Sequence, residues 1–175
     1  MREETSQPVE SHELPWYAVQ VKPRAGKAVS AALRLKGYAE FLPLYACQRV
    51  WSDRTKTVQL PLFAGYVFVQ LDIRHRLPVR KTPGVVSFVS LGAEPAPVDG
   101  RELAGIRSLV KSGLAVGPWP YLREGQEVEV AHGALKGLRG ILLKIKNECR
   151  LVVSVNLLRR SVAVEVDRES VRPVL

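Results

Sequence analysis

The sequence predicts an α+β protein with two domains: an N-terminal α/β sandwich, whose antiparallel sheet is flanked by helices, and a C-terminal all-β barrel. Apolar segments of period 2, separated by two helical stripes, fill the chain up to residue 112. The stretch "SGLAVGPWPY" then has the glycine and proline content of a domain boundary. After it come five short β-branched segments within about fifty residues, a spacing typical of a small barrel.

These features divide the chain into four parts. Residues 1–14 lack periodicity and aromatic residues and are expected to form a disordered acidic tail. Residues 15–112 form the sandwich, residues 113–122 the linker and residues 123–175 the barrel.

The composition predicts a globular protein with an anionic partner. Hydrophobic residues make up 46% of the chain, which is enough for a core. The formal net charge is +9, and the excess lies mostly between residues 15 and 120. Such a charge indicates association with a polyanion and says nothing about fold.

The two cysteines and the N-terminus indicate the cellular compartment. Cys47 and Cys149 are far apart and have no second cysteine or histidine at ligand spacing, which favours reduced thiols. The N-terminus is acidic, and no apolar run approaches ~18 residues. We therefore expect no export signal, no membrane span and a cytoplasmic monomer.

The first elements are a strand and a basic helix. "WYAVQV" predicts a strand over residues 16–21, and Lys22-Pro23 ends it. "RAGKAVSAALRLKG" has apolar residues at helical spacing and Gly37 as its stop. Arg24, Lys27 and Arg34 share one exposed face of this helix, which is either a solvated surface or an anion-binding one.

The aromatic stretch "PLFAGYVFVQLD" is predicted to lie in one long strand, after strands in residues 38–50 and the polar connection "WSDRTKT". Alternation places Tyr66 and Phe68 on one face and Val67 and Val69 on the other. Both faces are apolar. The strand is therefore either covered on both sides or leaves one face open to a partner.

The second helix closes the first domain. It follows the basic loop "IRHRLPVRKTPG", the strand "VVSFVS" and a turn-rich loop. Asp99 is its expected N-cap, and Glu102 is placed to complete a capping box. Its expected buried stripe consists of Leu103, Ile106, Leu109 and Val110.

The barrel segment indicates strands and turns. Gly133, Gly137 and Gly140 lack the lysine-hydroxyl ending of a phosphate loop, and we interpret them as turn residues with positive φ. The valine-rich "RLVVSVNLLRRSVAVEVD" favours strand over helix. The C-terminal domain is therefore not expected to adopt a helical hairpin as its dominant free state.

Motifs for catalysis are absent from the sequence. There is no G-x-S-x-G, H-E-x-x-H or C-x-x-C, and His12, His75 and His132 are isolated in a tail or turns. We therefore predict no enzymatic activity, no cofactor and no metal site.

Several blocks of the chain resemble the NusG family of transcription elongation factors. "WYAVQVKPRAGKA", "PLFAGYVFVQLD" and "PGVVSFVSLGAEPAPV", in this order, resemble its N-terminal domain. "GQEVEVAHGALKGLRGILLKI" resembles the KOW motif that begins an SH3-like barrel. The detail is most similar to specialised paralogues, the RfaH and UpxY antiterminators. Ala64 departs from the family, which usually has proline there.

The resemblance also implies binding sites for several partners. The family's N-terminal domain docks on the clamp helices of bacterial RNA polymerase, and the matching positions are Trp16, Tyr17, Phe63, Tyr66 and Phe68. Arg74, His75 and Arg76 match the segment that reaches the opposite polymerase subunit. Lys22, Arg24, Lys27 and Arg34 match a face beside non-template or upstream DNA. Leu157 and Leu158 match the place where the barrel meets a ribosomal small-subunit protein; in this family the barrel can instead engage Rho.

The expected function is binding: a transcription elongation or antitermination factor that suppresses pausing or termination and recruits a second partner through its barrel. The alternative is a ribosome-associated RNA-binding protein that uses the KOW barrel, because ribosomal proteins also carry this motif. Recovery of polymerase or of ribosomal RNA from a lysate would separate the two.

Overall fold

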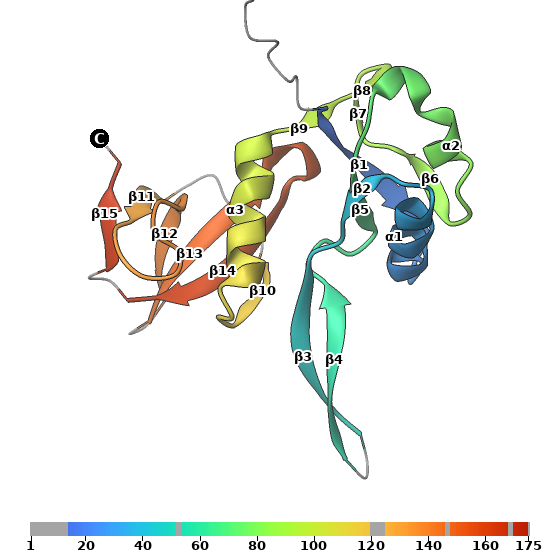
Figure 1. Ribbon diagram of the computed structural model, residues 1–175. Coiled ribbons are helices and arrows are strands. Elements are labelled where there is room, and N and C mark those ends of the chain that lie inside the picture. Colours follow the sequence, from blue (N-terminus) through green and yellow to red (C-terminus); the bar gives the residue numbers. More distant parts are fainter. Residues whose placement is uncertain (1–13, 52–53, 120–124, 146–147, 168–169, 175) are drawn as a thin grey trace, which may run out of the picture.

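The structure, a computed structural model, describes residues 14–51, 54–119, 125–145, 148–167 and 170–174 (Figure 1). The expected acidic tail therefore lies outside the described residues except for Leu14.

The N-terminal part contains nine strands, two α-helices, one short α-helical turn and a 3-10 turn among the described residues, although several strands are only two residues long. In chain order they are β1 Trp16–Val21, α1 Gly26–Leu35, β2 Ala39–Phe41, β3 Leu44–Val50, β4 Thr55–Pro61, β5 Tyr66–Gln70, η1 Ile73–His75, α2 Leu77–Arg80, β6 Val85–Phe88, β7 Ser90–Leu91, β8 Glu94–Pro95, β9 Pro97–Val98 and α3 Gly100–Lys111.

The central antiparallel sheet has the order β2-β5-β1-β6, and β9 also pairs with β1. β5 lies between β2 and β1, and side chains from two separate buried clusters cover its two faces. Val67 and Val69 pack with Val29 and Leu33 of α1 on one face. Phe68, which is fully buried, points to the other face. The alternation predicted for this strand is confirmed.

The predicted long strand over "VQLPLFAGYVFVQLD" is wrong in extent. It is two strands, β4 and β5, separated by a turn in which the Tyr66 N–H donates to the Phe63 carbonyl at 3.1 Å. Gly65 adopts φ 87°, which only glycine accepts easily, so the chain reverses there. β4 pairs with β3 in a hairpin that extends away from the central sheet (Figure 1).

The C-terminal part is a sheet of six strands with the order β10-β14-β13-β12-β11-β15. Its strands are β10 Val116–Trp119, β11 Gln126–Val130, β12 Arg139–Ile145, β13 Glu148–Val155, β14 Arg160–Val166 and β15 Val171–Pro173, with η2 at Asn156–Leu158. The five predicted strands are all present. β10 comes from residues assigned to the linker, and its Pro118 is tolerated because an edge strand has an unpaired side.

The valine-rich C-terminal segment is strand in the full chain. β13 and β14 pair over seven residue pairs from Cys149↔Val166 to Val155↔Arg160. This agrees with the preference of β-branched side chains for a pleated sheet.

Helix α3 joins the two parts into one core. Leu103, Ile106 and Leu109 belong to the same buried cluster as Phe68 of the central sheet and Val153 of the barrel. In Figure 1 the helix follows β9 and lies alongside the barrel strand β13. The predicted apolar stripe of this helix is therefore confirmed.

Replacing Gly140 with alanine is expected to destabilise the barrel by about 1–3 kcal/mol. The added methyl group overpacks the sheet, because the nearest atom belongs to the backbone of the neighbouring strand. An added Cβ would lie 2.5 Å from the Val152 carbonyl oxygen and 3.0 Å from Leu151 Cδ1. Gly117→Ala in the same sheet is the matched control, because its Cβ meets nothing within 4 Å. Urea unfolding measures both variants, and equal stabilities would contradict the close approach.

Candidate functional site

One face of the central sheet is rich in aromatic side chains. We call this set the aromatic face; it consists of Trp16, Phe41, Phe63, Tyr66 and Phe68. The Phe63 ring meets the Phe68 ring edge-on at 5.8 Å, and Phe41 stacks on Phe68 at 6.1 Å. Phe63 and Phe68 are 1% and 0% exposed, whereas Trp16 and Tyr66 are half-buried.

Tyr17 does not belong to the aromatic face, which corrects the expectation from sequence. Its ring points to the opposite side of the sheet and meets Phe88 edge-on at 6.2 Å. Adjacent residues of a strand point to opposite faces, so Trp16 and Tyr17 cannot share one docking surface.

Two arginines lie over the half-buried rings of the aromatic face. The Arg107 guanidinium of α3 is 4.3 Å from the centre of the Trp16 ring and 5.1 Å from that of Phe41. The Arg160 guanidinium, at the start of β14, is 6.0 Å from the Tyr66 ring centre. Both lie within the range of a cation–π interaction. The aromatic face is thus covered by α3 and by a corner of the barrel.

A polar contact fastens the same barrel corner to α3. The Glu102 carboxylate accepts hydrogen bonds from the Asn156 side-chain amide at 2.5 Å and from the Asn156 backbone N–H at 3.2 Å. The predicted capping box is therefore wrong in one half. Asp99 caps the helix by accepting from the Arg101 N–H at 2.7 Å, but Glu102 reaches the barrel instead.

Burial raises the pKa of Glu102, and the hydrogen bonds from Asn156 oppose this only in part. The folded chain then binds this proton more tightly than the unfolded chain, so the contribution of Glu102 to stability falls as pH rises above 4.5, its ordinary value. We expect the unfolding free energy of the wild type, relative to that of Glu102→Gln, to fall as the pH rises from 4.5 through the raised pKa of Glu102 and then to level off. Urea unfolding at several pH values measures it; a flat difference would contradict the burial of the carboxylate.

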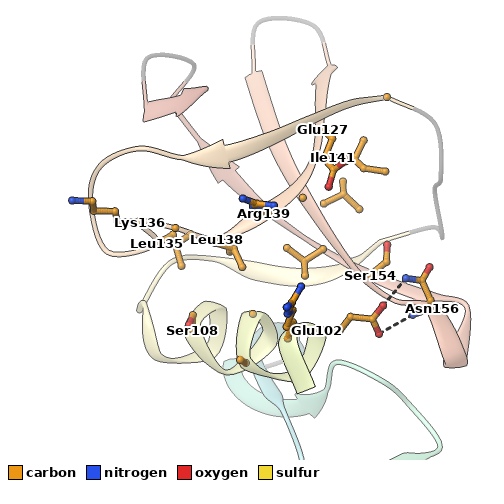
Figure 2. A pocket seen from close by; sticks show the side chains of 18 of the residues that line it. Glu102, Ser108, Glu127, Leu135, Lys136, Leu138, Arg139, Ile141, Ser154 and Asn156 are labelled. Atoms are coloured by element: carbon orange, nitrogen blue, oxygen red, sulfur yellow. Dashed lines mark hydrogen bonds between the residues drawn. The ribbon is translucent and has the colours of Figure 1, made fainter. Parts of the chain in front are cut away.

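A cavity of about 1070 Å³ opens between α3 and the turn that joins β11 to β12. Figure 2 shows Glu102 and Ser108 of the helix on one side and Leu135, Leu138 and Arg139 of the barrel on the other. Gly105 lies at the base of the contact, where an added Cβ would be 3.0 Å from Leu138 Cδ1. The helix and barrel therefore touch closely at Gly105 and leave open space around it.

The four predicted basic residues are exposed, but the predicted helical face is wrong in part. Lys22 and Arg24 precede α1, which begins at Gly26, and Arg24 has a φ of 64°. Lys22, Arg24 and Lys27 point to solvent. Arg34 forms an ion pair with Glu40, whose side chain is 5% exposed and which also accepts from the Ser30 hydroxyl at 2.5 Å. The guanidinium of Arg34 thus compensates a buried carboxylate, and its charge is less available to a partner.

The predicted basic loop folds into η1 and α2. Arg74 donates to both carboxylate oxygens of Asp72, and this lowers the pKa of Asp72 to about 2. The His75 ring nitrogen Nδ1 lies 3.6 Å from the same carboxylate, and Arg76 pairs with Glu94 at 3.4 Å. All three basic side chains remain on the surface, although Arg76 is half-buried.

The barrel residues expected to bind a partner lie in η2. Leu158 is 7% exposed and is part of the shared core, whereas Leu157 is half-buried against it. In the turn between β11 and β12, Gly133 and Gly137 adopt φ 86° and 83° as predicted. Gly140 instead lies in β12, where the backbone of Val152 in the neighbouring strand approaches too closely for a side chain.

Other site chemistry can be stated only for the part of the chain that is described. Cys47 and Cys149 are free thiols there. The described histidine, cysteine and acidic side chains form no group of three that could hold a metal ion. Among the described helices, none has the length and apolarity to cross a membrane.

Three residues of this site were not predicted from the sequence, Phe41, Arg107 and Arg160, and Glu102 was predicted only as part of a capping box. Phe41 is the last residue of the short strand β2 and could have been recognised from alternation in "YAEF". Arg107 and Arg160 are surface-type residues whose partners lie far away in the chain, so no local signal points to them.

Comparisons with known proteins agree with this architecture. The family described as "NusG: Transcription termination factor nusG" matches residues 14–107. The transcription termination/antitermination protein NusG of Thermus thermophilus is 29% identical over 65% of this chain and 68% of its own length. That of Borreliella burgdorferi is 23% identical over 91% of this chain and 98% of its own.

A solved structure described as "Domain interaction in Thermotoga maritima NusG" has the same fold. The two structures superpose with a TM-score of 0.56 at 23% sequence identity. The match covers 92% of this chain and 97% of the Thermotoga maritima chain. The fold is thus an α+β N-terminal domain with few helices followed by an all-β barrel. With the family match over more than half of the sequence, this chain belongs to the NusG family of transcription termination/antitermination factors.

Proposed function

We propose that the chain binds RNA polymerase through its aromatic face and works by binding, without chemistry of its own. The observation that supports this is the concentration of rings on one side of the sheet. The opposite side is already filled by a separate core that it forms with Val29 and Leu33 of α1. On the aromatic face, by contrast, arginines of α3 and the barrel lie over the half-buried rings of Trp16 and Tyr66. Aromatic residues of this kind are the usual anchors of interfaces.

Polymerase binding would displace the barrel from this face. Phe63 and Phe68 are buried together with barrel residues, so a helical partner reaches them only when the barrel corner at Asn156–Arg160 moves away. Helix-in-groove recognition would then replace one apolar contact by another. The chain is thus proposed to alternate between a closed form and a polymerase-bound form.

The same movement would free the second binding site. Leu157 and Leu158 lie in the corner that faces the central sheet, next to Arg160 above Tyr66. Both proposed partner sites therefore cover each other in the closed form. Recruitment of a ribosomal small-subunit protein or Rho by the barrel would follow polymerase binding.

Two basic regions would support the complex. Lys22, Arg24 and Lys27 are proposed to meet the phosphates of non-template or upstream DNA, with Arg34 contributing less because Glu40 holds it. Arg74, His75 and Arg76 are proposed to reach the opposite polymerase subunit. The expected outcome is suppression of pausing or termination in the bacterial cytoplasm, as in specialised antiterminators.

An affinity capture tests the proposal. The tagged full-length chain should recover the large subunits of RNA polymerase from a lysate treated with nuclease. Recovery of ribosomal RNA and ribosomal proteins without polymerase, in an untreated lysate, would favour the ribosome-associated alternative. Weaker recovery of polymerase by Tyr66→Ala than by wild type would tie the capture to the aromatic face.

A further inference from the structure

The β3–β4 hairpin carries a surface that the polymerase proposal does not use. Arg49 of β3 lies directly opposite Lys56 of β4. Beyond them the Trp51 N–H donates to the Arg54 carbonyl at 2.8 Å, so the ladder continues by one more rung. Side chains two residues apart on a strand share a face, so Arg49, Trp51, Arg54 and Lys56 lie on one side. We call this set the hairpin basic face.

The hairpin basic face is open to solvent. Trp51 is 57% exposed, and its three cationic neighbours are exposed as well. Among the described residues none of these cations forms an ion pair with an acidic side chain. In Figure 1 the hairpin points away from both the central sheet and the barrel. A large aromatic ring in such a place contributes nothing to a core.

The pairing within the hairpin is unfavourable by itself. Like charges directly opposite each other on two strands destabilise the ladder, and Arg49 and Lys56 are such a pair. A bound anion between them would remove the repulsion. The arrangement therefore indicates an anionic partner more strongly than a scattered set of surface cations would.

The partner must also offer a flat apolar face to Trp51. The rung of Trp51 and Arg54 lies about 6.7 Å along the hairpin from that of Arg49 and Lys56. Phosphates next to unpaired bases have this combination of negative charge and stacking surface, and proteins that bind single strands combine cations with aromatic rings in this way. An acidic peptide would supply the charge without the stacking surface.

We propose that the hairpin basic face binds single-stranded nucleic acid, with phosphates on Arg49, Lys56 and Arg54 and one base stacked on Trp51. The site is separate from the aromatic face and from Lys22, Arg24 and Lys27, which lie before and in the first turn of α1. It needs neither polymerase nor release of the barrel.

Binding of the full-length chain to a fluorescein-labelled oligothymidylate, followed by fluorescence anisotropy, tests the proposal. Trp51→Ala should weaken binding roughly 10-fold, because each stacked base contributes strongly. The double variant Arg49→Ala/Lys56→Ala should reduce the magnitude of the log–log salt slope by ~1.4, since each phosphate contact on a single strand contributes ~0.7. A duplex of the same length should bind more weakly than the single strand.

Two control variants separate the site from general charge. Arg80→Ala/Lys81→Ala removes the same charge from exposed positions at the C-terminal end of α2, and Leu91→Ala removes an apolar side chain that is 73% exposed. Both should leave affinity for the single strand and its salt slope nearly unchanged. Circular dichroism should show every variant folded, and the loss of the Arg49–Lys56 repulsion should not lower thermal stability.

Three results would overturn the proposal. The first is equal affinity of Trp51→Ala and wild type for the single strand, and the second is an equal change of salt slope in the two double variants. The third is binding to phosphatidylglycerol vesicles that requires Trp51 while the oligonucleotide does not bind, which would make the tip a membrane contact. Because the assay contains no polymerase, its failure leaves the proposed function untouched, and failed polymerase capture leaves this site untouched.

Discussion

Tyr66→Ala is expected to weaken binding to RNA polymerase by about 1–3 kcal/mol, the range for truncating an aromatic anchor at the centre of an interface. The Tyr66 ring is half-buried beneath Arg160, so its loss should cost little stability. Phe63→Ala differs from it. Because Phe63 is 1% exposed in the shared core, its truncation is also expected to cost about 3–5 kcal/mol of unfolding free energy.

The measurement is titration of fluorescent full-length chain with purified core polymerase, together with urea unfolding of each variant. Tyr38→Ala is the matched control, because Tyr38 is a half-buried aromatic packed on the α1 side of the sheet. It should leave polymerase affinity unchanged. Equal affinities for Tyr66→Ala and wild type, with both folded, would remove the aromatic face from the interface.

Gly105→Trp is expected to separate the barrel from α3 and to increase affinity for RNA polymerase. An added Cβ at Gly105 already lies 3.0 Å from Leu138 Cδ1 and 3.6 Å from Val153 Cγ1, so an indole at this position pushes against the barrel side chains. Overpacking of this kind costs about 1–3 kcal/mol or more. The closed form would lose that stabilisation, and a partner would no longer have to displace the barrel.

Lys111→Trp is the control for this variant, because Lys111 is an exposed residue of the same helix. Small-angle X-ray scattering should show a larger radius of gyration for Gly105→Trp than for Lys111→Trp. Polymerase affinity should rise by roughly 5-fold to 150-fold, the equivalent of about 1–3 kcal/mol. A separated barrel with unchanged affinity would mean that the barrel does not cover the polymerase-binding face.

Local patterns in the sequence predicted most elements. β1, α1 and the five barrel strands β11 to β15 all follow from periodicity and β-branched content. The positive φ at Gly133 and Gly137 follows from turn chemistry. These features depend on neighbours a few residues away, so the sequence contains the whole signal.

The misplaced elements have physical reasons. The stretch from Val58 to Asp72 is apolar almost throughout, and this composition suits two strands as well as one; Gly65 alone marks the reversal. Tyr17 was grouped with Trp16 although alternation separates adjacent residues. β10 was hidden because Gly117 and Pro118 are disfavoured inside sheets and tolerated at an edge.

The aromatic face is covered through contacts between residues far apart in the sequence, and no local pattern indicates such contacts. Glu102 is correctly placed for a capping box, but Asn156, which lies 54 residues away in sequence, offers it two donors. Similarly, Phe63 lies in a turn, and its burial arises from α3 and the barrel meeting above it. The sequence therefore indicated four of the five rings of the aromatic face, but neither Phe41 nor the fact that the face is covered.

Site-specific photo-cross-linking tests the central claim most directly. p-Benzoylphenylalanine is placed at Tyr66 or, as the control, at Tyr38, and the full-length chain is irradiated with purified core polymerase. The account predicts that position 66 forms a covalent product with the largest polymerase subunit and that position 38 forms none. A product from position 38 alone, or no product from position 66 while the chain remains bound to polymerase, would contradict binding through the aromatic face.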